Sequence, residues 1–119
     1  MGNKETGQKG EERACKYLLD KGYEIIERNY RTKTGEIDII IKKAETLAFV
    51  EVKTLPQATP DMLSSVLNRQ KLQRILKTSK RFLLNHRQYS NSYIRYDVIV
   101  LDMQGLPEVY HIENAFMEK

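Results

Sequence analysis

Three ionisable residues, Asp38, Glu51 and Lys53, have the types and the spacing of a phosphodiester-hydrolysing site. Mg²⁺ in proteins commonly takes one or two carboxylates together with waters and substrate phosphates, so the two acids predict a Mg²⁺ or Mn²⁺ cofactor. A lysine beside them can neutralise charge and can orient or deprotonate an attacking water near the ion. On spacing alone, ordinary ion pairs at strand ends account for the same residues about as well.

Two predicted strands, 36–43 and 46–54, would position this cluster. Both are rich in β-branched side chains, which are frequent in strands. So few residues separate them that the simplest connection is an antiparallel hairpin with Ala44 and Glu45 as a two-residue turn. The turn lacks the favoured Asn-Gly or Asp-Gly pair, so a different loop with a shifted register remains open.

The simplest hairpin register brings the acids together. It places Asp38 opposite Glu51 and Glu36 opposite Lys53, with all four on one face of the hairpin. Like charges in opposed positions repel, and a divalent cation would offset that repulsion. The opposite face would be wholly apolar, formed by Ile37, Ile39, Ile41, Ala48, Val50 and Val52.

An N-terminal helix is predicted from about residue 7 to residue 21, with Gly22 as its left-handed C-cap. Ala14, Cys15 and Leu18 follow the spacing of one helical face, and Glu11 lies on that face one turn earlier. Glu11 could therefore reach a site at the sheet. A first-turn carboxylate favoured by the helix macrodipole is an equal alternative.

The segment after Pro60 is predicted to be helical, with Thr59 as a possible cap and a bend near Asn68. Strands at 23–30, 94–102 and 109–112 complete the prediction. Because the hairpin is apolar on both faces, helices should cover each side of it. The expected fold class is α/β, with a central mixed sheet in the order αβββαββ. Leu72, Ile75, Leu76, Ser79, Phe82 and Leu83 form the expected core stripe of the second long helix, and Lys71, Arg74, Lys77 and Arg81 are expected on its opposite side.

Charge is strongly segregated along the chain. Residues 62–96 contain eight Lys and Arg residues and no Asp or Glu. Since the whole chain has a net charge of +4, the rest of the chain has a net charge of −4. Such a basic segment is typical of a polyanion-binding protein, here DNA or a related nucleic acid. A solvated helix face is the simpler alternative.

Length and composition limit the remaining possibilities. The 119 residues suit one domain, residues 1–119, and hydrophobic residues at 40% are enough for a core. One cysteine, Cys15, excludes an intramolecular disulfide, and the first residues lack the apolar run of a signal peptide. No stretch approaches the roughly 20 apolar residues of a membrane span. These features predict a cytoplasmic protein without a membrane partner.

Longer motifs carry a family resemblance. Asp38 and the run Glu51-Val52-Lys53 resemble the signature of the PD-(D/E)xK nuclease superfamily. An ordered set of runs resembles the small bacterial YraN-like family over nearly the whole chain: Gly7-x-x-Gly10-Glu11-x-x-Ala14, Gly22-Tyr23, Asn29-Tyr30-Arg31, Gly35-Glu36-Ile37-Asp38, Phe49-Val50-Glu51-Val52-Lys53-Thr54, Arg95-Tyr96-Asp97-Val98 and His111-Ile112-Glu113-Asn114-Ala115-Phe116.

This resemblance implies a restriction-endonuclease-like fold, with Asp38, Glu51 and Lys53 as a catalytic triad and Glu11 as a helix carboxylate near the metal. The family is similar to Holliday-junction resolvases, which implies structured or branched DNA as substrate and makes a homodimer an expectation. Leu55 stands where the family often has Arg after the Thr of this run. Two functions remain open: a metal-dependent endonuclease, and a non-catalytic nucleic-acid-binding module that retains the fold.

Overall fold

The structure is a computed structural model, and it describes residues 3–63 and 69–116. The elements follow the predicted order. They are the helix α1 (Asn3–Asp20), the strands β1 (Glu24–Thr32), β2 (Gly35–Lys43) and β3 (Thr46–Thr54), the helix α3 (Arg69–Asn85), and the strands β4 (Tyr93–Leu101) and β5 (Val109–Ile112), with short 3₁₀ helices at Pro60–Met62 and Arg87–Tyr89. Among the described helices, none is long and apolar enough to cross a membrane.

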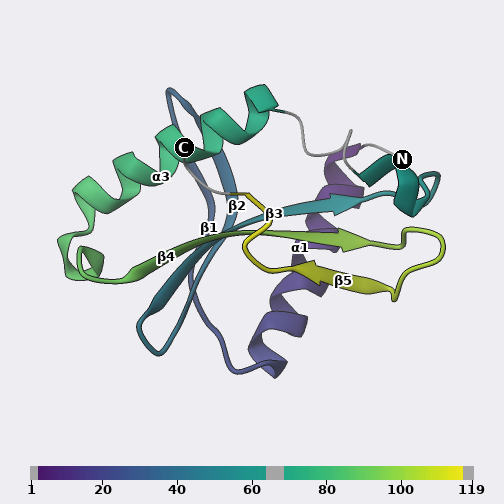
Figure 1. Cartoon of the computed structure of the whole chain (residues 1–119), viewed down its shortest axis with the longest axis horizontal. Helices are drawn as coiled ribbons and strands as arrows, with labels where there is room; N and C mark the ends of the chain where they lie inside the picture. Colours follow the sequence, from purple (N-terminus) through teal and green to yellow (C-terminus); the bar gives the residue numbers. More distant parts are fainter. Residues whose placement is uncertain (1–2, 64–68, 117–119) are drawn as a thin grey trace.

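One five-stranded mixed sheet runs through the molecule in the order β1-β2-β3-β4-β5 (Figure 1). The first three strands form an antiparallel meander, β4 lies parallel to β3, and β5 lies antiparallel to β4. Parallel neighbours need a long crossover connection, and the segment that contains α3 supplies it. The α/β class and the αβββαββ order are therefore confirmed.

The first helix ends where the sequence predicts. Gly22 has a φ of 91°, and its amide donates to the Leu19 carbonyl at 3.0 Å. The next amide, of Tyr23, donates to the Leu18 carbonyl at 3.0 Å, which completes a Schellman motif. The helix begins at Asn3, earlier than predicted, and its buried Ala14, Cys15 and Leu18 turn toward the sheet.

The two long helices cover opposite faces of the sheet (Figure 1). Under α1, Ile39, Ile41, Ala48 and Val50 form one apolar cluster together with Ile99 and Leu101. Under α3, Ile40, Leu47 and Phe49 form a second cluster with Ile75, Phe82 and Tyr96. β2 and β3 therefore bury both of their faces, as the sequence predicted for the central hairpin.

One apolar assignment is wrong. Ile37 was expected on the face of Ile39 and Ile41, but it packs in the cluster under α3 together with Ile40. The recorded pairing of β2 with β3 begins at Ile39, whereas β2 continues to pair with β1 as far as Gly35. The β1–β2 hairpin leaves the plane of the sheet toward its tip, which rises to α3 (Figure 1). In the part of β2 that precedes Ile39, strict alternation therefore no longer decides which of the two cores a side chain enters.

After β3, the described residues form a short 3₁₀ helix at Pro60–Met62 and then the long helix α3. Pro60 opens a 3₁₀ helix, as its fixed φ favours, but Thr59 makes no side-chain cap bond to the backbone and its hydroxyl donates to Asp61 instead. The predicted bend near Asn68 lies outside the described residues. From Arg69 onward α3 carries the predicted core stripe, with Ile75, Ser79 and Phe82 buried.

Candidate active site

The β2–β3 hairpin brings the two predicted acids together. Ile39 pairs with Val50 and Lys43 with Thr46, which is the predicted register, and Ala44 in the turn has a positive φ of 52°. The β2 residues that precede Ile39 are not paired with β3. In their place, the Asp38 carboxylate accepts a hydrogen bond from the Val52 main-chain amide at 2.8 Å. Where β2 and β3 separate, the Asp38 side chain thus replaces a main-chain carbonyl as the acceptor for the Val52 amide. This bond holds Asp38 against β3.

The two carboxyl groups interact directly. Asp38 and Glu51 lie close enough for the charge of each to disfavour ionisation of the other. Burial, then the charge of Glu51, raises the pKa of Asp38 to about 8, although the Val52 amide acts in the opposite direction. Glu51 itself is only 8% exposed. The pair therefore favours a state in which Asp38 keeps its proton at neutral pH.

Two lysines approach this acid pair. Lys53 Nζ lies 3.7 Å from Glu51 Oε1, and Lys71 Nζ lies 3.0 Å from the same oxygen. Burial, and then the neighbouring Lys71, lower the pKa of Lys53 below its ordinary value, while Glu51 and Asp38 limit the fall. An amine with a lowered pKa beside a carboxylate pair can act as a proton acceptor as well as a cation.

The predicted partner of Lys53 is wrong in one respect. Glu36 does not face Lys53 but lies 3.3 Å from Arg31, its cross-strand neighbour on β1. The parting of β2 from β3 is the cause, because it carries Glu36 away from the end of β3.

The site opens into a pocket of about 260 Å³ between the sheet and α3. Its lining combines the acid pair with one turn of helix, and comprises Gly35, Glu36, Asp38, Glu51, Lys71, Arg74 and Ile75. Lys71 was expected on the outer side of α3, and this placement is wrong: its half-buried side chain reaches Glu51. The spacing contained the signal, because Lys71 precedes the buried Ile75 by one helical turn and so shares its face.

Glu11 lies near the site but is engaged elsewhere. Its carboxylate is 3.8 Å from the Arg28 guanidinium. Burial raises the pKa of Glu11, and the charges of Glu36 and Glu51 add to that rise. Glu11 is thus within electrostatic range of the acid pair, although it is not among the residues that line the pocket.

The number and type of oxygen ligands at the site suit a hard divalent cation. Two carboxylates and an open polar pocket match the ligand set in which Mg²⁺ keeps several waters. The proximity of Asp38 to the buried carboxyl group of Glu51, which helps to raise the pKa of Asp38, agrees with such an ion. Within the described part of the chain, no group of three or more His, Cys, Asp or Glu is arranged to hold a metal. The geometry therefore fits a two-carboxylate site rather than one that includes Glu11.

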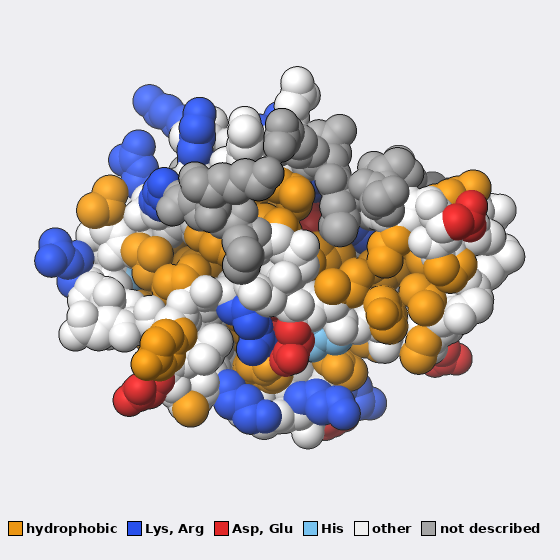
Figure 2. Space-filling view, in the orientation of Figure 1, with side chains coloured by type: hydrophobic (Ala, Val, Ile, Leu, Met, Phe, Trp, Pro, Cys, Tyr) orange, Lys and Arg blue, Asp and Glu red, His pale blue; other side chains and the backbone are white. Residues whose placement is uncertain are grey.

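The remaining predicted basic residues do lie on the surface. Arg74, Lys77 and Arg81 are exposed along α3, and Arg74 borders the pocket. Figure 2 shows Lys and Arg side chains gathered over α3 at the upper left. The path from the acid pair to solvent is thus bordered by positive charge.

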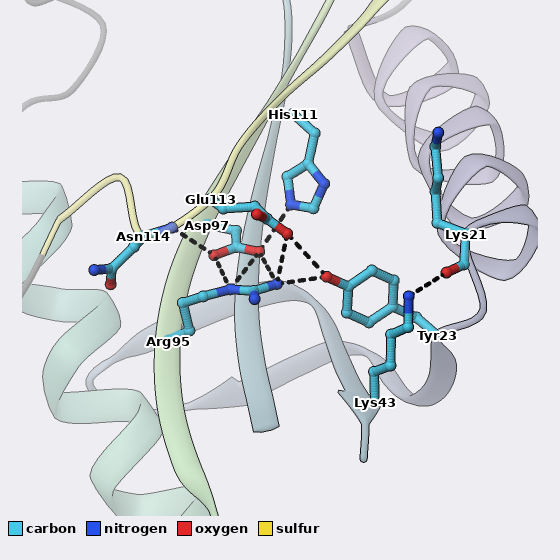
Figure 3. A network of polar contacts seen from close by, with 8 residues as sticks. All are labelled: Lys21, Tyr23, Lys43, Arg95, Asp97, His111, Glu113 and Asn114. Atoms are coloured by element: carbon cyan, nitrogen blue, oxygen red, sulfur yellow. Dashed lines mark hydrogen bonds and ion pairs between the residues drawn. The ribbon is translucent and has the colours of Figure 1, made fainter. Parts of the chain in front are cut away.

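A second polar cluster lies on the other face of the sheet, under α1 (Figure 3). At its centre Asp97 is fully buried and accepts hydrogen bonds from the Arg95 guanidinium, from His111 Nε2 and from the Asn114 amide, at 2.8–3.2 Å. Burial alone would raise the pKa of Asp97, but these bonds outweigh it and hold the pKa below its ordinary value. Both carboxylate oxygens of Asp97 accept hydrogen bonds from these groups. We therefore interpret the cluster as structural, because it attaches β5 and the following turn to β4.

Comparisons with known proteins place the chain in a protein family. The profile described as "Uncharacterised protein family UPF0102" matches residues 10–101. A UPF0102 protein of Treponema denticola is 46% identical, with 92% of this chain and 93% of the relative covered, and one of Treponema pallidum is 41% identical, with 96% and 94% covered. A UPF0102 protein of Alkaliphilus oremlandii is 40% identical over 96% of this chain and 99% of the relative. The chain therefore belongs to the uncharacterised protein family UPF0102, the YraN family.

Proposed function

We propose that this protein binds nucleic acid, with DNA as the expected form, and hydrolyses its phosphodiester bonds at the Asp38–Glu51 pocket with the help of Mg²⁺ or Mn²⁺. The observation that carries the proposal is the juxtaposition of two carboxyl groups with an amine of lowered pKa, in a pocket bordered by basic side chains. Perturbed ionisation in a cleft is characteristic of functional sites.

Each residue has a distinct task. Asp38 and Glu51 would hold the divalent ion, and the ion would supply Lewis-acid stabilisation of charge on the scissile phosphate. Lys53, which is 3.7 Å from Glu51, is placed to accept the proton of the attacking water or to stabilise the developing negative charge. Lys71 and Arg74 can contact phosphate oxygens at the mouth of the pocket. In the hydrolysis, the water oxygen forms a bond to phosphorus, an ester P–O bond breaks, and the leaving oxygen takes up a proton.

One observation favours the alternative of a non-catalytic binding module. Lys71 Nζ is already 3.0 Å from Glu51, so an ammonium neutralises part of the acid pair without any metal. In that case the acids and lysines would stabilise the fold, and the basic surface alone would bind nucleic acid. The two proposals differ in whether the pocket takes a cation.

The test is a substrate panel of branched, duplex and single-stranded DNA and RNA, incubated with Mg²⁺ or Mn²⁺. The unmodified protein should cut at least one member, and the double variant Asp38→Asn, Glu51→Gln should cut none while it keeps its affinity for the uncut substrate. Glu45→Gln, at an exposed position in the β2–β3 turn, is the matched control and should cut normally. Binding without cleavage by the unmodified protein would establish the non-catalytic alternative.

A further inference from the structure

A second pocket lies farther along α3, between this helix and the tip of the β1–β2 hairpin. Its volume is about 400 Å³, and it is lined by Tyr30, Arg31, Thr32, Lys33, Arg81 and Asn85. The described residues of this lining include three cations and no acid. Such a lining suits a phosphate group, because Arg and Lys donate charge-assisted hydrogen bonds to phosphate oxygens.

The hairpin tip is fixed to α3 by a chain of hydroxyl groups. Thr34 Oγ1 lies 2.9 Å from Thr78 Oγ1 and 2.7 Å from Thr32 Oγ1, and the Thr78 hydroxyl donates to the Arg74 carbonyl at 2.8 Å. Gly35 permits this approach, since a Cβ there would lie 3.2 Å from Thr78 Oγ1, and its φ of 152° disfavours other residues. The tip therefore presents Arg31 and Lys33 from a positioned strand end.

The two pockets lie on either side of this contact. Arg74 borders the acid pocket, Thr78 meets the hairpin tip, and Arg81 borders the second pocket, so they succeed one another along one flank of α3. Lys71 and Arg81 are ten residues apart in the sequence. At about 1.5 Å per residue the two pockets are about 15 Å apart. Phosphates on one strand of a duplex advance about 3.4 Å per nucleotide along the axis and also wind around it, so this separation spans a few nucleotides of backbone.

We propose that the pocket of Arg31, Lys33 and Arg81 is a second phosphate subsite, which holds the backbone of a nucleic acid a few nucleotides from the phosphate at Asp38 and Glu51. The inference rests on the proposed function and adds a second backbone contact to it. Arg31 can exchange an ion pair with Glu36 for one with a phosphate. Its side chain is 73% exposed, and the pair with Glu36 lies on the surface. Surface pairs of this kind contribute little to stability and are readily given up to a phosphate.

The test compares two triple variants in nucleic-acid binding without divalent ions, so that cleavage plays no part. Arg31→Gln, Lys33→Gln, Arg81→Gln removes the subsite. Lys16→Gln, Lys21→Gln, Lys42→Gln removes three charges from exposed or half-buried positions on α1, just after α1 and at the far end of β2. Affinity for a 20-base-pair duplex is measured by fluorescence anisotropy over a series of salt concentrations. Circular dichroism checks that both variants are folded.

We expect the subsite variant to bind about 10- to 100-fold more weakly, and its slope of log affinity against log salt to be smaller by about 2–3, since each phosphate contact contributes about 0.9. The control should keep the slope of the unmodified protein. Equal behaviour of the two variants would overturn the subsite while leaving the proposed function intact. If the unmodified protein does not bind nucleic acid, both proposals are wrong, and if it binds as expected without cutting the panel, only catalysis is lost.

Discussion

Replacement of Asp38 by Asn should stabilise the metal-free protein, although the same change removes a proposed metal ligand. Asp38 faces another carboxyl group and receives one main-chain donor, from Val52. The introduced amide can keep that bond through its oxygen and can donate its N–H to Glu51. Repulsion between like groups is thereby replaced by a hydrogen bond.

The magnitude follows from the ionisation of Asp38. A pKa raised from 3.8 to about 8 means that the folded protein retains a proton that the unfolded chain loses, so stability falls as the pH rises from about 4 to about 8. At 1.36 kcal/mol per pKa unit the upper limit at pH 7 is about 4.4 kcal/mol. Attraction from Lys53 and Lys71 and partial contact with solvent reduce this figure, so we expect a gain of about 1–2 kcal/mol.

The measurement is thermal and urea unfolding in EDTA at pH 5 and pH 8. Asp38→Asn should raise Tm by about 3–8 °C at pH 8 and by less at pH 5. Asp97→Asn is the matched contrast, because it makes the same change on β4, where Asp97 accepts bonds from Arg95, His111 and Asn114. It should cost about 3 kcal/mol or more, since it removes the buried charge that pairs with Arg95 and leaves Arg95 with the more exposed Glu113. If both variants lose stability alike at pH 8, the proposed repulsion at Asp38 does not exist.

Three further predictions concern the site and its support. Isothermal titration calorimetry should detect Mn²⁺ binding to the unmodified protein and none to the folded Asp38→Asn, Glu51→Gln double variant, and unchanged affinity there would refute the two-carboxylate site. Lys53→Ala should lower the single-turnover cleavage rate by about 10²-fold or more and leave substrate affinity nearly unchanged, since the amine acts on the transition state. A lower Tm with an unchanged cleavage rate would make Lys53 a structural counter-ion. Gly10→Ala should lower stability by about 1–3 kcal/mol, because its Cβ would lie 2.7 Å from a β3 threonine hydroxyl. Gly7→Ala, with nothing within 4 Å of its Cβ, should be neutral or stabilising in the same unfolding assay.

Local patterns were sufficient for most elements. The alternation of β2 and β3, their short separation and the Gly22 cap predicted the hairpin register and the end of α1, and both are confirmed. These features depend on interactions between residues close in the chain, which is why a single sequence contains them. The proximity of Asp38 and Glu51 follows from the same register.

Other features depend on where strands stop pairing and how helices lie over the sheet. Ile37, Glu36 and Lys71 were all misplaced, and for related reasons. β2 pairs with β3 only from Ile39 onward, and α3 crosses the sheet at the point where Lys71 meets Glu51. The second pocket likewise requires the Thr34–Thr78 contact between segments more than forty residues apart. The sequence alone determined which residues share a strand or helical face, because that is set by backbone periodicity. Only the tertiary structure decided which of those faces meet, because the parting of strands and the position of a helix result from packing of the whole core.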